Sequence, residues 1–234
     1  MRGFHIVITS VIVGTASIVT AQTTETATQV PAAAASGSLK PLEIKLPKPV
    51  FVGTPKNIKV ENLEVGGKSR DAFLAPADAV NLALKKEVTS SDNEPVIGEL
   101  EQITDGNKEA ADGNYVELGP GRQWVQIDLG QVCEISAVVI WHFHQQARVY
   151  HDVVVQSADD PDFIKNVQTI FNNDHDNTAQ LGIGKDKAYV ETNEGRLIDA
   201  KGVKGRYIRL VSKGNTSNEM NHYIEVEVYG RAAK

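Results

Sequence analysis

The sequence has almost no cysteine and no excess of basic residues. Cys133 is its single cysteine, which excludes an intramolecular disulfide and any zinc site made of several thiolates. Lys and Arg number 24 against 30 Asp and Glu, a net charge of −6. This balance argues against a nucleic-acid partner, because neutralising phosphates requires clustered cations. The sequence also lacks a phosphate-binding loop, a dinucleotide-binding fingerprint, a Gly-x-Ser-x-Gly elbow and a His-Glu-x-x-His motif, so it offers no enzyme signature.

The composition is otherwise that of a folded protein. Of the 234 residues, 41% are apolar and 23% are charged, which excludes wholesale disorder. The length allows one large domain or two small ones.

The N-terminus has the plan of a secretory signal peptide. One positive charge at Arg2 precedes an uncharged apolar stretch from Ile6 to Val19, and small residues up to Ala21 suit a signal peptidase. The alternative is an uncleaved membrane anchor, which is less favoured because the apolar stretch is too short to span a bilayer comfortably. We therefore predict a signal at 1–21 and a mature protein without a membrane span, secreted, periplasmic or at the cell surface.

Two loosely organised regions follow the signal. Residues 22–39 are rich in Thr, Ala and Gln, and predict a flexible linker. Residues 40–80 interleave prolines with short apolar groups, which predicts an extended, Pro-rich segment that packs on the main domain and has no core of its own. The prolines of that segment are Pro41, Pro47, Pro49, Pro55 and Pro76.

Residues 81–230 have the texture of an all-β domain, followed by a short tail at 231–234. Gln123–Gly130 alternates apolar and polar residues, and Ile135–Phe143 is long, β-branched and aromatic. Tyr223–Tyr229 alternates again near the end. Turns rich in Gly, Asn and Asp separate these stretches, and no long stretch has a helical period. The pattern predicts a sandwich of two sheets.

Four pieces of this region resemble, in order, the discoidin or coagulation factor V/VIII C-type domain. That family belongs to the galactose-binding-like jelly-roll superfamily, so the resemblance implies a jelly-roll β-sandwich over residues 81–230. The four pieces are Asn81–Ser91 (NLALKKEVTSS), Ile103–Asn107 (ITDGN), Trp124–Gly130 (WVQIDLG) and Ile224–Gly230 (IEVEVYG).

The resemblance also implies a structural calcium ion between the Asp-Gly-Asn turn and the closing strand. Side-chain oxygens would come from Asp105 and Glu225, and main-chain oxygens from Asn107 and Ile224. Calcium takes about six to eight such hard oxygen ligands. The alternative is an Asx turn beside a solvent-facing Glu, which needs no ion. The sequence departs from the family pattern because no hydroxyl-x-Trp follows the turn, so the usual hydroxyl ligand is missing.

Candidate ligand-binding residues gather after the strand that ends near Phe143. Sugar recognition uses an aromatic face and a few fixed hydrogen-bonding groups, and loops at one end of a sandwich present such groups. Trp141 and Phe143 alternate with the histidines and are expected to face the core. The polar run 172–177 is a second candidate, although a solvated loop is the simpler interpretation. The candidates are His142, His144, Arg148, Tyr150, Asp174 and His175.

Family resemblance and residues together predict an exported, non-catalytic binding module that recognises a carbohydrate through rim loops of a calcium-stabilised jelly-roll. A bacterial origin is expected because the disulfides of vertebrate members are absent. The first alternative is an adhesion module of the same fold that binds a cell-surface protein. The second is a metal-dependent hydrolase that uses His142 and His144, which share one face of a strand.

Overall fold

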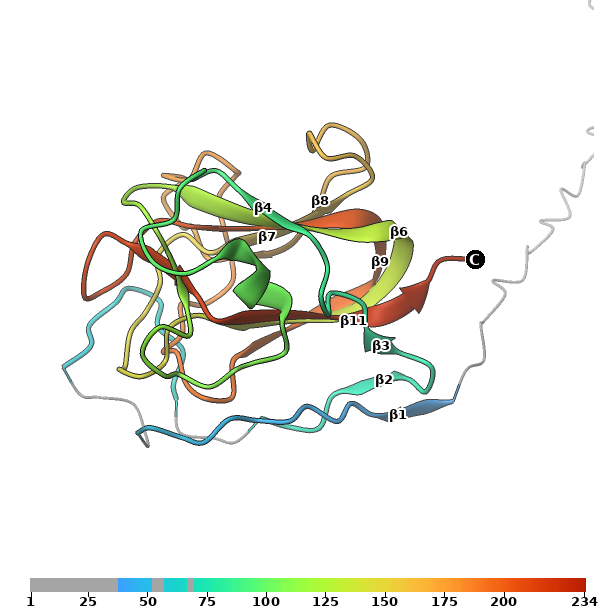
Figure 1. The fold of residues 1–234 in the computed structure, drawn as a ribbon, viewed down its shortest axis with the longest axis horizontal. Helices are drawn as coiled ribbons and strands as arrows, with labels where there is room; N and C mark the ends of the chain where they lie inside the picture. Colours follow the sequence, from blue (N-terminus) through green and yellow to red (C-terminus); the bar gives the residue numbers. More distant parts are fainter. Residues whose placement is uncertain (1–37, 52–56, 67–69) are drawn as a thin grey trace, which may run out of the picture. The chain divides into compact units, whose positions relative to one another are not determined.

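A computed structural model describes residues 38–51, 57–66 and 70–234 (Figure 1). The predicted signal at 1–21 and all but the last two residues of the predicted linker at 22–39 lie outside the described residues. Within the described part of the chain, the only helical element is one turn of 3-10 helix, η1 (Leu100–Thr104). None of its elements is a helix long and apolar enough to cross a membrane.

Eleven strands make up the rest of the regular structure, and the long β6 and β9 dominate it. Most of the others are short. Their bounds are β1 (Leu39–Pro41), β2 (Leu74–Pro76), β3 (Val80–Asn81), β4 (Val88–Ser90), β5 (Val116–Leu118), β6 (Gln123–Trp141), β7 (Val154–Ala158), β8 (Gln168–Asn172), β9 (Arg196–Ser212), β10 (Asn221–Tyr223) and β11 (Glu225–Ala232).

The main sheet folds over itself into two layers, and β6 and β9 belong to both (Figure 1). In the first layer, residues 123–128 of β6 pair with β4 and with the end of β9. The end of β9 also pairs with β7, and β8 pairs with the other edge of β7. In the second layer, residues 133–141 of β6 pair with the start of β9 and with β11, and β3 lies outside β11. Pairing is antiparallel throughout.

A bend at residues 129–132 carries β6 from one layer to the other. The register with β9 shifts between Asp128 and Cys133, and Gly130 has a φ of +85°, in the left-handed region that favours glycine. On the facing strand, Lys201 and Gly202 also have positive φ. Irregularities of this kind turn a strand through a sheet corner.

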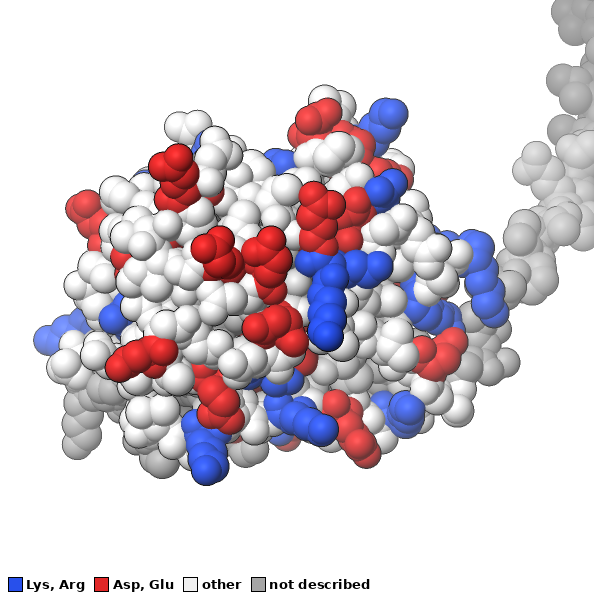
Figure 2. Space-filling view, in the orientation of Figure 1, with Lys and Arg blue, Asp and Glu red and all other residues white. Residues whose placement is uncertain are grey.

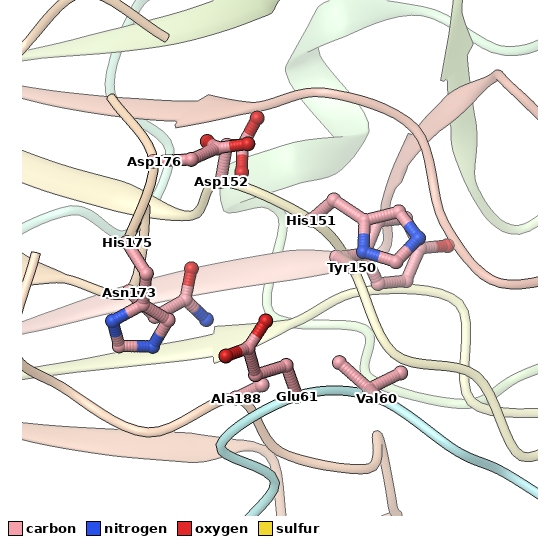
Figure 3. Close-up of a pocket in the computed structure, with 9 residues that line it drawn as sticks. All are labelled: Val60, Glu61, Tyr150, His151, Asp152, Asn173, His175, Asp176 and Ala188. Atoms are coloured by element: carbon pink, nitrogen blue, oxygen red, sulfur yellow. The ribbon is translucent and has the colours of Figure 1, made fainter. Parts of the chain in front are cut away.

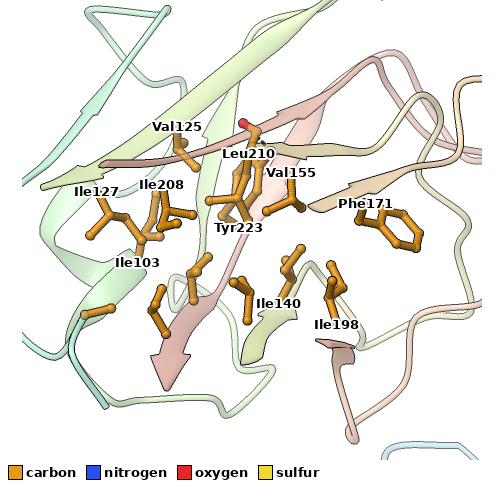
Figure 4. Packing of buried hydrophobic residues seen from close by; sticks show 14 of the residues in the cluster. Ile103, Val125, Ile127, Ile140, Val155, Phe171, Ile198, Ile208, Leu210 and Tyr223 are labelled. Atoms are coloured by element: carbon orange, nitrogen blue, oxygen red, sulfur yellow. Dashed lines mark hydrogen bonds between the residues drawn. The ribbon is translucent and has the colours of Figure 1, made fainter. Parts of the chain in front are cut away.

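The main hydrophobic core lies between the two layers (Figure 4). Val125 and Ile127 face it from the first layer, whereas the intervening Gln126 binds Arg209 on the outer side. Ile140 and Ile198 face it from the second layer. The alternation seen in the sequence therefore gives the expected inward and outward faces. The prediction of an all-β jelly-roll sandwich is confirmed.

The outer face of the second layer is also buried. Val139 and Trp141 form a second apolar cluster there, against Leu42, Ile44 and Phe73 of the stretch before the main domain. The backbone N–H of Leu42 donates to the carbonyl of Phe73 at 2.8 Å, beside the β1–β2 pair. Burial on both faces explains why 135–143 is a continuous apolar run rather than an alternating one.

Trp141 and Phe143, which were expected to face the core, are buried in this second cluster rather than in the main core between the layers. On the face shown in Figure 2, acidic and basic side chains are interspersed.

Candidate functional site

A pocket of about 160 Å³ opens where three segments of the chain meet (Figure 3). The first is the loop 142–153 between β6 and β7, and the second is the loop 173–195 between β8 and β9. The third is the stretch 57–66, which precedes the discoidin-like region. The polar side chains that line the pocket are Glu61, His151, Asp152, Asn173, His175 and Asp176.

Asn173 extends the β7–β8 ladder by one pair into the pocket. Its backbone N–H donates to the carbonyl of Val153 at 3.1 Å, and the N–H of Val153 donates to Asn173 Oδ1 at 2.7 Å. The side chain is thereby fixed, and the residue is only 5% exposed. Within the described part of the chain its Nδ2 has no hydrogen-bond partner, although a buried amide donor is costly to leave unpaired. The amide points toward the other lining side chains (Figure 3).

The His175 ring is held in a single orientation at the pocket wall. Asn62 Nδ2 donates to His175 Nε2 at 2.8 Å, so Nε2 is the acceptor. Nδ1 then carries the proton and donates to the carbonyl of Gly184 at 3.2 Å. The ring therefore joins the stretch 57–66 to the loop after β8.

Three carboxylates converge beside the pocket. Oxygens of Asp152, Asp174 and Asp176 lie within 4.8 Å of one another, close enough to hold a metal ion together. Burial raises the pKa of Asp174, although it accepts backbone N–H bonds from Thr178 and Ala179. A hydrogen bond from Asp174 lowers the pKa of the exposed Asp176. The cluster is thus an acidic centre that favours a cation beside it.

The structure places His142 and His144 beneath the surface rather than on the rim. His142 is fully buried, its Nδ1 is 2.6 Å from Glu191 Oε1, and its ring stacks on Tyr150 with centroids 4.3 Å apart. His144 Nε2 donates to the carbonyl of Lys108 at 3.0 Å. The two histidines therefore have separate partners and do not converge on one point. Sequence periodicity gave no sign that Glu191, nearly fifty residues later, would supply a buried partner.

Tyr150 and Arg148 belong to the same buried layer as His142. Tyr150 donates from its hydroxyl to His222 Nδ1 at 3.0 Å, and His222 Nε2–H donates to Glu117 Oε2 at 2.9 Å. Burial, together with Arg148 and His142, lowers the pKa of His222 to about 3, so its ring is neutral. Burial raises the pKa of Tyr150. Arg148 lies over the Phe143 ring at 4.6 Å.

Of the six ligand candidates from sequence, Tyr150 and His175 line the pocket, and Asp174 lies directly behind it. Five polar lining residues are not among those candidates: Glu61, His151, Asp152, Asn173 and Asp176. Asn173 and Asp176 lie in the polar run 172–177 that was singled out, and His151 and Asp152 directly follow Tyr150. Their closeness in sequence to the predicted residues was the signal that could have identified them. Nothing in the sequence pointed to Glu61, because only the fold brings the stretch 57–66 to this end of the sandwich.

A second polar site joins the first Asp-Gly-Asn turn to the closing strand. Gly106 N–H donates to Glu225 Oε2 at 3.0 Å, and Asn107 N–H donates to Asp105 Oδ1 at 2.7 Å. Glu225 is fully buried, none of the described residues hydrogen-bonds its Oε1, and burial raises its pKa to about 8. A buried carboxylate oxygen without a donor beside an acidic turn fits a hard cation.

Comparison with known proteins supports the fold. Neither the protein-family models nor the curated proteins match the sequence. Among solved structures, the family 89 glycoside hydrolase from Clostridium perfringens, in complex with 2-acetamido-1,2-dideoxynojirmycin, is similar over 66% of this chain at a TM-score of 0.50 and 19% identity. This chain spans only 15% of that enzyme.

Two smaller neighbours match over nearly their whole length. The CBM32 module of AlyQ, in complex with 4,5-unsaturated mannuronic acid, is 19% identical at a TM-score of 0.46, covering 61% of this chain and 92% of that one. A Streptococcus pneumoniae fucose binding module is 22% identical at a TM-score of 0.45, covering 64% and 97%. At such identities the similarity concerns the fold alone.

Proposed function

We propose that this chain is an exported, non-catalytic module that binds carbohydrate in the pocket beside Asn173. The observation that carries the proposal is the fixed, buried amide of Asn173, a lining residue whose Nδ2 has no hydrogen-bond partner among the described residues. Carbohydrate sites are concave and present a few rigid donors and acceptors, and the hydroxyl groups of a sugar supply acceptors for such a donor.

Among the ligand classes that the discoidin resemblance implies, the pocket favours a glycan. Phospholipid head groups, a further ligand class of discoidin-type domains, carry a phosphate, whereas the described lining has three acidic side chains and no Lys or Arg. A protein partner in a stable complex needs about 800 Å² of surface on each side, much more than this pocket offers. A cell-surface protein remains the alternative ligand, bound through the loops around the pocket.

A metal-dependent hydrolase built on His142 and His144 gains no support from their surroundings. Both residues are at most 1% exposed, and each has its own hydrogen-bond partner. A substrate would not reach either ring without opening the loop 142–153.

Calcium is the proposed cofactor of the second polar site. Asp105 and Glu225 would contribute side-chain oxygens, and Asn107 and Ile224 main-chain oxygens. Bound there, the ion would neutralise the buried Glu225 and hold the turn 105–107 against β11. The cluster of Asp152, Asp174 and Asp176 offers carboxylate oxygens for a second cation.

The binding proposal is tested by screening the protein on a glycan array and titrating the bound glycans in solution. On titration, the ring C–H signals of His151 and His175 should shift in the NMR spectrum. Asn173→Asp keeps the acceptor for Val153 but replaces the free donor by an acceptor, so we expect affinity to fall about tenfold or more, as for a lost hydrogen bond of about 1.4 kcal/mol.

The matched control is Asn166→Asp, in the exposed loop at the other end of β7 and β8, which should bind like the wild type. Melting curves verify that both variants fold. No glycan signal on the array, together with a protein recovered by cross-linking, would favour the adhesion alternative and reject the proposal.

A further inference from the structure

Specific hydrogen bonds and an ion pair hold the stretch 57–66 at the pocket. Glu64 N–H donates to the carbonyl of Ala188 at 2.8 Å, and Arg196 binds the Glu64 carboxylate with one nitrogen, at 2.9 and 2.7 Å from its two oxygens. Asn62 bonds the ring of His175. These contacts fix the residues that directly follow Val60 and Glu61, which are the two residues of this stretch that line the pocket. The position of Glu61 is therefore set by anchored neighbours on its C-terminal side.

The lining of the pocket has a strongly one-sided charge. Glu61, Asp152 and Asp176 are acidic, and none of the described residues that line the pocket is Lys or Arg. Asp174 lies behind them, with an oxygen within 4.8 Å of oxygens of Asp152 and Asp176. Among the ion pairs of the described chain, one joins Lys213 to a lining carboxylate: its Nζ is 3.9 Å from Asp152 Oδ2, and its side chain is 37% exposed. A half-exposed lysine at that distance offsets little of this charge.

The acidic lining and the Asn173 donor set different requirements on a ligand. Asn173 Nδ2 requires an acceptor, which a sugar hydroxyl supplies. The carboxylates accept hydrogen bonds, and they bind most strongly to a charged N–H donor. A uronic acid would instead place a carboxylate next to three others, which like-charge repulsion disfavours.

We infer that the pocket selects a sugar that carries a free ammonium group, and that Glu61 from the stretch 57–66 is a determinant of this specificity. The inference rests on the proposed function. The ammonium group donates to Glu61 and Asp152, while a ring hydroxyl accepts from Asn173. Part of the preference thus comes from a segment outside the discoidin-like region, so that region alone gives a weaker preference.

Calorimetric titration with three oligosaccharides tests the inference. The probes are a glucosamine tetramer, cellotetraose, which has the same linkage and a hydroxyl in place of each amine, and a uronic acid tetramer. We expect the glucosamine tetramer to bind at least about tenfold more tightly than cellotetraose at low salt, and the uronic acid tetramer to bind most weakly. Added salt should reduce the first ratio.

Glu61→Gln removes one charge and keeps the size of the side chain. It should reduce the preference for the glucosamine tetramer over cellotetraose about fivefold, with the affinity for cellotetraose unchanged. Glu43→Gln is the matched control, because Glu43 is an exposed glutamate of the same N-terminal region and does not line the pocket. Asp176→Asn gives a second, independent removal of charge.

The outcomes separate the inference from the function on which it rests. If none of the three oligosaccharides binds and the array is blank, the proposed function fails, and the inference with it. If cellotetraose or the uronic acid tetramer binds as tightly as the glucosamine tetramer, or Glu61→Gln leaves the ratio unchanged, only the inference is overturned. Loss of the preference in millimolar calcium, with calcium bound at the aspartates, also overturns it, because the cluster then serves a metal.

Discussion

Glu225 Oε2 accepts a hydrogen bond from the backbone N–H of Gly106, a residue 119 positions earlier in the chain, at 3.0 Å. This bond joins the turn after η1 to the closing strand β11. Tying the beginning and end of a domain together in this way is a role often given to a disulfide, which a chain with one cysteine cannot form.

Removal of calcium is expected to lower the melting temperature. An ion present at about 100 times its Kd stabilises a protein by about 2.7 kcal/mol, and each kcal/mol corresponds to about 2–4 °C for a protein of this size. A chelator should therefore shift the melting curve down by several degrees, as measured by calorimetry. Asp105→Ala should abolish the sensitivity, whereas Asp112→Ala, in the second Asp-Gly-Asn turn, should keep it. A melting temperature that is unchanged by the chelator would contradict the calcium site.

Acid is expected to destabilise the fold through His222. Its pKa is lowered from 6.5 to about 3 in the folded protein, so between these values the unfolded chain binds a proton that the folded chain does not. The free energy of unfolding should therefore fall as the pH drops from 6.5 toward 3, by up to about 1.4 kcal/mol per pH unit from this residue. The raised pKa of Glu117 acts in the opposite direction, because it favours protonation in the folded state.

Urea denaturation at successive pH values measures this slope. His222→Gln keeps a donor and an acceptor but does not titrate, so its slope between pH 6.5 and 4 should be shallower than that of the wild type. Equal slopes for the variant and the wild type would show that His222 does not cause this pH dependence of stability.

Gly195→Ala is expected to destabilise the protein strongly. Gly195 has a φ of +64°, and a Cβ there would lie 2.6 Å from the Trp141 ring, which is fully buried and donates from Nε1 to the carbonyl of Asn193. Overpacking of this kind costs about 1–3 kcal/mol, in addition to about 1–2 kcal/mol for the left-handed backbone.

Gly113→Ala separates the two contributions. Gly113 has a φ of +77° with nothing within 4 Å of the added Cβ, so only the backbone cost applies. Denaturant unfolding should therefore show a clearly larger loss for Gly195→Ala. Similar losses for both variants would mean that the Trp141 ring yields to the added methyl group.

The sequence predicted the sandwich because alternation and turn residues are local properties. Val125 and Ile127 reveal an inward face directly, and Trp141 and Phe143 were assigned to the core by the same alternation. Loop residues have no regular alternation, so their burial could not be predicted in this way. His142 has the sequence context of a rim residue, yet it is buried because Tyr150 and Glu191 close over it. The pocket could not be predicted for the same reason, since Glu61 and Asn173 meet only through long-range contacts.

The sharing of β6 and β9 between both layers has a consequence for unfolding. Each layer depends for its hydrogen bonds on the same two strands, so neither layer has a set of strands that is complete without the other. Melting monitored by tryptophan fluorescence, with Trp124 in one layer and Trp141 in the other, should accordingly follow a single transition. A substitution that destabilises either layer is therefore expected to lower the stability of the whole domain.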